Sequence, residues 1–141
     1  MCIKYFINKI NTGHWILKDT TIDCNTFGFV YIIINTINNK KYIGCKQIYS
    51  KSKKETGWRS YTGSSNTLNK EIEQFGKSNF KFIIIDTASS KSELKFKELL
   101  YQLANNVLFR DDYYNGIINI RLSKVKGVNS INNLDTFLIN F

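Results

Sequence analysis

The chain has 141 residues, of which 43% are hydrophobic and 14% aromatic. This length suits one folded domain, and the hydrophobic content is too high for a disordered chain. Its net charge of +9 indicates a nucleic-acid partner, although a solubilising charge or an anionic membrane surface remains an alternative. No apolar run approaches the roughly 18 residues of a membrane span, and no signal-peptide pattern is present. We therefore expect a soluble, intracellular protein that does not contact a membrane.

The cysteines are odd in number and widely spaced, at Cys2, Cys24 and Cys45, and His14 is the only histidine. A structural zinc site needs four clustered ligands, which this spacing does not offer. We expect three free thiols in a reducing compartment.

Residues 1–27 are expected to form an extension, either an arm or one or two strand-like pieces beside the core. Short apolar runs alternate there with polar residues. We interpret His14 and Trp15 as packing residues and not as chemical groups.

Residues 28–44 predict a β-hairpin. An aromatic and β-branched run at 29–34 is followed by an Asn-rich turn around Asn38 and Asn39 and by a short strand at 41–44. Asparagine tolerates left-handed backbone angles, which favours chain reversal at this point.

The segment after the hairpin is basic and aromatic. It contains Lys46, Lys53 and Lys54, followed by Trp58 and Arg59. Lysines mixed with aromatic residues suit a surface that follows a phosphate backbone, whereas an ordinary solvated loop is the alternative for this segment alone.

Two helices and a strand are expected next. Ser64 or Ser65 can cap a helix that ends near Phe75, with Gly76 as its stop. Residues 79–86 predict a central strand. A second helix, from the Ser90 capping box to about residue 106, should bury a face made by Leu99, Leu100, Leu103 and Val107, with Glu98 half-buried beside it.

The C-terminal residues 121–141 are expected to form a basic extension with Arg121, Lys124 and Lys126, and residues 136–141 an edge strand or a short helix. Together these elements predict an α/β (α+β) fold. It has a small, mainly antiparallel central sheet of three or more strands, flanked by helices. We place the main domain at residues 28–120 within a single-domain chain.

Four motifs in order resemble those of the GIY-YIG nuclease superfamily. Residues 29–31 (Phe-Val-Tyr) and 42–44 (Tyr-Ile-Gly) resemble its paired signature, with Phe29 in the first glycine position. Residues 98–101 (Glu-Leu-Leu-Tyr) resemble its metal-binding glutamate, and Tyr114-Asn115 resembles the motif that closes the domain. The resemblance covers residues 28–119 and is to free-standing phage and homing members.

This resemblance implies a metal-dependent DNA endonuclease that hydrolyses phosphodiester bonds. Glu98 would bind one Mg²⁺ or Mn²⁺ per active site, and Tyr31 would accept the proton of the attacking water or position it. Tyr42 would bind the water or the phosphate, and Asn115 would fix the geometry. Taken singly, each residue has an ordinary structural explanation, and Glu93 competes with Glu98.

The resemblance also implies an arginine after the second motif that clamps the phosphate. We assign it to Arg59, the first arginine after that motif, with Lys53 as an alternative. A bidentate guanidinium there would neutralise developing charge. Lys46 would lower the pKa of the base or contact the phosphate, and nucleic acid would also contact Lys54, Trp58 and Ser64. An inactive nucleic-acid-binding module is the second interpretation, and a protein-interaction inhibitor is the third.

Double-stranded DNA is the expected partner. No further module is expected, so specificity would come from the N-terminal segment, the basic loop, a homodimer or another protein. A phage-encoded member would act in the host cytoplasm.

Overall fold

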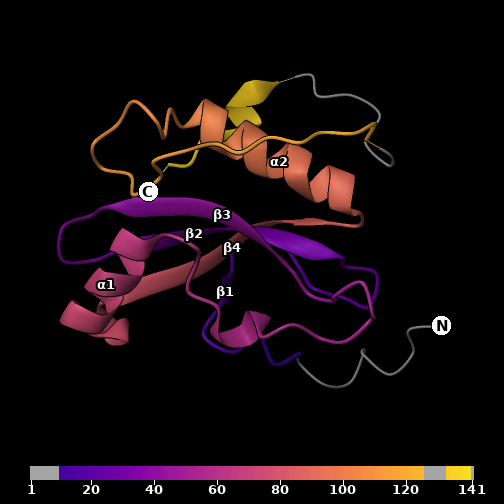
Figure 1. Cartoon of the computed structure of the whole chain (residues 1–141), viewed down its shortest axis with the longest axis horizontal. Coiled ribbons are helices and arrows are strands. Elements are labelled where there is room, and N and C mark those ends of the chain that lie inside the picture. Colours follow the sequence, from indigo (N-terminus) through magenta and orange to yellow (C-terminus); the bar gives the residue numbers. More distant parts are fainter. Residues whose placement is uncertain (1–9, 126–132, 141) are drawn as a thin grey trace.

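The computed structural model describes residues 10–125 and 133–140, and its centre is a mixed four-stranded sheet (Figure 1). The spatial order is β1-β4-β2-β3, in which β2 is antiparallel to both neighbours and β1 is parallel to β4. The strands are β1 (Ile16–Leu17), β2 (Gly28–Asn35), β3 (Lys41–Gln47) and β4 (Phe80–Ala88). The predicted α+β class is confirmed.

Two helices cover opposite faces of this sheet. Leu68 and Ile72 of α1 (Asn66–Phe75) belong to the apolar cluster on one face. Leu94 and Tyr101 of α2 (Lys91–Ala104) belong to the cluster on the other. Figure 1 shows α2 above the sheet and α1 below it.

The predicted hairpin is formed by β2 and β3. Every residue of β2 is buried, and Asn39 in the turn has a φ of 60°, the left-handed conformation that asparagine tolerates. The second strand continues beyond the predicted end at Gly44, because Cys45 to Gln47 pair with the start of β2. The hairpin therefore presents a longer outer strand than the sequence indicated.

The predicted strand at 79–86 is β4, and it lies inside the sheet between β1 and β2. The register between β2 and β4 shifts between Val30 and Tyr31, so that one additional residue, Ile85, is accommodated in β4. A bulge at this point increases local twist immediately before Tyr31.

Both helices begin as the sequence predicts. Ser65 accepts a hydrogen bond from the Leu68 backbone N–H, and Ser90 accepts one from the Glu93 N–H. Gly76, with a φ of 84°, ends α1.

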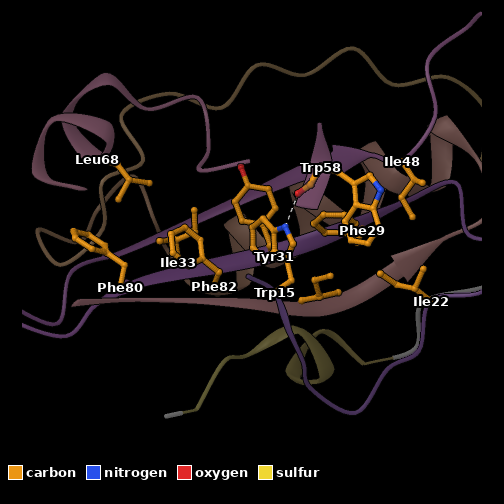
Figure 2. Close-up of a cluster of buried hydrophobic side chains, with 11 residues drawn as sticks. Trp15, Ile22, Phe29, Tyr31, Ile33, Ile48, Trp58, Leu68, Phe80 and Phe82 are labelled. Atoms are coloured by element: carbon orange, nitrogen blue, oxygen red, sulfur yellow. Dashed lines mark hydrogen bonds between the residues drawn. The ribbon is translucent and has the colours of Figure 1, made fainter. Parts of the chain in front are cut away.

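The segment before the hairpin packs against the core (Figure 2). The Trp15 indole Nε1 donates to the Trp58 carbonyl at 2.6 Å, and the His14 ring stacks on Phe82 with centroids 3.9 Å apart. Burial lowers the pKa of His14 to about 4. The interpretation of His14 and Trp15 as packing residues is confirmed, and β1 adds a strand to the sheet.

The α1 face of the sheet carries an aromatic core, drawn in Figure 2. Tyr31 is part of it, and its side chain is only 1% exposed. The cluster consists of Trp15, Ile22, Phe29, Tyr31, Ile33, Ile48, Trp58, Leu68, Phe80, Phe82 and Ile84.

The predicted core face of the second helix was partly wrong. Leu103 is 54% exposed, whereas Leu94, Tyr101 and Val107 are buried. The face turned to the sheet is the stripe that starts at Leu94 and passes Glu98, because positions three and four apart share one side of a helix.

The described C-terminal residues include a 3₁₀ helix, η4 (Leu134–Phe137), which corresponds to the short-helix alternative. It is held on α2 by Phe137, whose ring meets Tyr101 edge-on with centroids 5.0 Å apart. Lys126 and Phe141 lie outside the described residues.

The expectation of three free thiols was wrong for Cys24, which is disulfide-bonded, whereas Cys45 is free. Cys2 and the remainder of residues 1–9 lie outside the described part of the chain. No helix within that part is long and apolar enough to span a membrane.

Candidate active site

Tyr31 and Tyr42 lie on the same face of the sheet, on adjacent strands. Side chains alternate along a strand, so Tyr42, Gly44 and Lys46 of β3 share one face. Tyr31 of β2 pairs with Gly44, and the rings of the two tyrosines have centroids 6.2 Å apart. The two predicted tyrosines are therefore brought together.

Gly44 provides the space into which the Tyr31 hydroxyl extends. A β-carbon at Gly44 would lie 2.5 Å from the Tyr31 Oη, closer than packed atoms allow. Gly63 flanks the same oxygen, since a β-carbon there would lie 3.4 Å away. The phenol thus crosses β3 between two glycines.

A third tyrosine, Tyr61, joins the pair and was not predicted. Its ring centroid is 6.1 Å from that of Tyr31, and the Lys46 Nζ lies 4.2 Å from the Tyr61 centroid. The only signal in the sequence was its position in the basic and aromatic segment. We call Tyr31, Tyr42 and Tyr61 the tyrosine cluster. Lys46 is the cation that contacts it.

Tyr42 is held by the loop before α1, as its hydroxyl and that of Ser64 are 2.9 Å apart. Burial raises the pKa of Tyr42, and it raises the pKa of Tyr31 well above the usual tyrosine value, with a smaller contribution from Tyr42. Both phenols are therefore protonated at neutral pH in this state and are available as hydrogen-bond donors.

Glu98 approaches the same strand from the α2 side. Its carboxylate accepts from the Lys95 Nζ at 3.2 Å, and its side chain is 17% exposed, as predicted for a half-buried position. Burial of the Cys45 thiol and, to a smaller extent, the nearby charge of Glu98 raise the pKa of that thiol to about 12. The charge of Glu98 also contributes to the raised pKa values of Tyr31 and Tyr42. The carboxylate is therefore electrostatically coupled to both tyrosines.

Glu93, the competing carboxylate, is engaged in hydrogen bonds and an ion pair at the start of α2. It accepts hydrogen bonds from the Ser89 backbone N–H at 3.0 Å and the Ser89 hydroxyl at 2.7 Å, and it pairs with Lys97 at 3.1 Å. These bonds secure the first turn of α2. They leave Glu98 as the better metal-binding candidate.

Asn115 completes the outer edge of β3. Its side-chain amide accepts from the Ile43 N–H at 3.0 Å and donates to the Ile43 carbonyl at 2.8 Å, as a neighbouring strand would. Gln102 of α2 donates to the same carbonyl at 3.1 Å, a contact that the sequence did not reveal. These two amides tie the closing segment and the helix of Glu98 to the centre of the Tyr-Ile-Gly motif.

Arg59 does not join this arrangement in the described residues. Its guanidinium forms an ion pair with Glu55, donates to the Asn11 carbonyl at 2.8 Å and lies 4.5 Å from the Trp58 ring centroid. No hydrogen bond or ion pair connects it to Tyr31 or Tyr42 within residues 10–125 and 133–140. Its contacts hold the loop to the N-terminal segment.

Trp58, which was expected to contact nucleic acid, is buried in the core of this structure. Its side chain is 1% exposed, packs against Phe29 and donates from the indole nitrogen to Glu55. A ring inside the core cannot stack on a base. Lys53 and Lys54 are exposed in the turn between Tyr49 and Glu55.

The comparison with protein families found a match. A family model described as "Putative endonuclease segE, GIY-YIG domain" matches residues 15–118. This chain belongs to the SegE GIY-YIG domain family. The comparisons with curated proteins and with solved structures found no match.

The match of this GIY-YIG domain begins at Trp15 and so includes β1 and the segment before the hairpin. It ends at residue 118, three residues past Asn115, and the basic segment that contains Arg121 follows it. The family thus covers the sheet, both helices and the candidate active site.

The donor set of the GIY-YIG domain fits a hard cation that retains most of its waters. No group of three or more His, Cys, Asp or Glu side chains gathers at one point in the described residues. Glu98 supplies one carboxylate, on the other face of β3 from the two phenols, and Mg²⁺ is often held by one or two carboxylates plus substrate phosphate. In this structure Lys95 neutralises that carboxylate.

Proposed function

We propose that this protein is a metal-dependent DNA endonuclease. The observation that supports it best is the meeting of two groups at β3: the tyrosine cluster with Lys46 on one face, and Glu98 from the helix on the other. Phosphodiester hydrolysis needs an oriented water, neutralised phosphate charge and a stabilised leaving oxygen. The first two requirements have candidate residues here.

Glu98 would hold one Mg²⁺ or Mn²⁺, which supplies Lewis-acid stabilisation of the scissile phosphate when bound. Tyr31, a protonated phenol beside Gly44, would orient the attacking water by hydrogen bonding. Tyr42, on the adjacent strand β3, would donate a hydrogen bond to a phosphate oxygen or to the water.

Lys46 is our preferred phosphate-binding cation, because its ammonium already lies against Tyr61. Arg59, expected as the clamp, would first have to leave Glu55 and the Asn11 carbonyl. Asn115 would act by holding Ile43 in register and not by moving a proton.

Double-stranded DNA is the proposed substrate, in keeping with the net charge of +9. One active site cuts one strand, so a double-strand break would require two protomers or two successive events. A homodimer or a protein partner would serve this purpose. A phage or homing role in a host cytoplasm is the corresponding biological proposal.

A non-catalytic nucleic-acid-binding module is the second candidate. The ion pair of Arg59 with Glu55 and the replacement of the first motif glycine by Phe29, which is fully buried in the core, favour it. Such a module would bind DNA and show no cleavage in any divalent metal.

The test is cleavage of supercoiled plasmid and of long mixed-sequence DNA in Mg²⁺, Mn²⁺ or EDTA, comparing the wild type with Glu98→Gln. We expect metal-dependent cutting that Glu98→Gln abolishes while DNA binding in EDTA is retained. The matched control is Glu73→Gln, which removes an exposed carboxylate from α1 and should cut normally. Full activity of Glu98→Gln would refute the metal-binding role.

A further inference from the structure

A basic pocket of about 380 Å³ lies beside α2, next to the candidate active site. It is lined by Lys91, Ser92, Lys95, Arg121, Leu122 and Ser123. The chain after Asn115 returns along α2 in Figure 1 and brings residues 121–123 to the first turns of that helix. These three residues follow the end of the family match at residue 118.

The lining carries three cations and two hydroxyl groups, and no carboxylate and no aromatic ring. Lys91 and Lys95 lie one helical turn apart, a spacing at which like charges repel. Within the described residues, neither Lys91 nor Arg121 has an ion-pair partner. An anion in this pocket would relieve the repulsion among all three side chains.

Lys95 connects this pocket to the candidate metal-binding residue. Lys95 is one of the lining residues, and its ammonium lies 3.2 Å from the Glu98 carboxylate and 3.6 Å from the Cys45 Sγ. An anion held by Lys91 and Arg121 would therefore lie on the α2 side of β3, the side from which Glu98 approaches.

We propose that this pocket binds a backbone phosphate of the DNA strand, on the side of the candidate active site that carries Glu98. The cations and hydroxyls suit phosphate oxygens, and Arg121 can bind two of them at once. The missing aromatic ring argues against a stacked base. This inference depends on the proposed nuclease function and adds a substrate contact from the segment after the family match.

The test is DNA binding in EDTA, where no metal-dependent cutting occurs, over a series of salt concentrations. The double variant Lys91→Gln/Arg121→Gln removes two proposed phosphate contacts and leaves Lys95 beside Glu98. We expect affinity to fall about equally for all sequences and the log–log salt slope to decrease by about 2. Lys81→Gln/Lys124→Gln, which removes two exposed charges outside the pocket, is the matched control and should keep the wild-type slope.

Wild-type affinity and slope in the pocket variant would overturn the proposal, as would an equal loss in both double variants. Circular dichroism and the melting temperature should match the wild type in each. If no DNA is cut by the wild type but the pocket variant alone loses binding, the nuclease proposal fails while this phosphate site stands.

A second arm uses inorganic phosphate, followed by the backbone amide NMR signals of residues 91–95 and 121–123. Saturable shifts that the pocket variant loses, together with the weakened DNA binding, support the proposal. Phosphate binding with unchanged DNA affinity would identify a site for free anions and overturn the DNA contact.

Discussion

The hydroxyl group of Tyr31 lies over Gly44 on the adjacent strand, where a β-carbon would approach within 2.5 Å. The strand register pairs these two residues directly. The glycine of the Tyr-Ile-Gly motif is therefore required by the side chain of the neighbouring strand, and not by its own backbone angles. Its function is to let the buried phenol reach across β3.

We expect Gly44→Ala to displace the Tyr31 hydroxyl and reduce cleavage by about 100-fold, since small misplacements of a reacting group are costly. Single-turnover plasmid cleavage measures this, with DNA affinity in EDTA unchanged. Gly57→Ala is the matched control, because a β-carbon there meets nothing within 4 Å. Normal cleavage by Gly44→Ala would show that Tyr31 does not act from this position.

Lys46→Gln should reduce single-turnover cleavage by about 100-fold, the typical effect of removing one group that stabilises developing charge. Arg59→Gln should cost less than about 5-fold, as it breaks a partly exposed ion pair with Glu55. Lys53→Gln, in the exposed turn, provides the comparison for loss of charge alone. If Arg59→Gln proved the more damaging, the arginine would have to leave Glu55 when DNA binds.

Asn115→Asp should lower the free energy of unfolding by about 3 kcal/mol, because the carboxylate cannot donate to the Ile43 carbonyl and would be buried beside it. Gln102→Met should cost about 1 kcal/mol, the net value of one hydrogen bond. Urea unfolding monitored by tryptophan fluorescence measures both. Equal stability of Asn115→Asp and the wild type would contradict the proposed role of this amide at the sheet edge.

Stability should decrease as the pH falls from about 6.5 to about 4, owing to His14. Burial lowers the folded-state pKa of His14 to about 4, so in this range the unfolded chain binds a proton that the folded chain excludes. Above pH 6.5 neither state is protonated, and below pH 4 both are. His14→Phe should preserve the stacking on Phe82 and make the melting temperature less dependent on pH between about 6.5 and about 4. An unchanged pH profile in His14→Phe would contradict this assignment.

The sequence alone determined the hairpin, the central strand and the two helices of this protein, because the signals for them are local. The apolar run of β2, the positive-φ asparagine at position 39, the Ser65 and Ser90 caps and the Gly76 stop act within a few residues of one another. The order of the motifs was also sufficient to predict the family, although the first glycine is replaced by Phe29.

Only the tertiary structure decided which predicted residues meet. Trp58 entered the core and Arg59 turned to Glu55, because the segment that carries them packs against Trp15 and Asn11, more than 40 residues earlier. Tyr61, Gln102 and Arg121 gained their positions through contacts between distant segments. Local patterns specify where a strand or helix begins and ends. The partner of a side chain across the fold depends on register and packing, which no short stretch of sequence encodes.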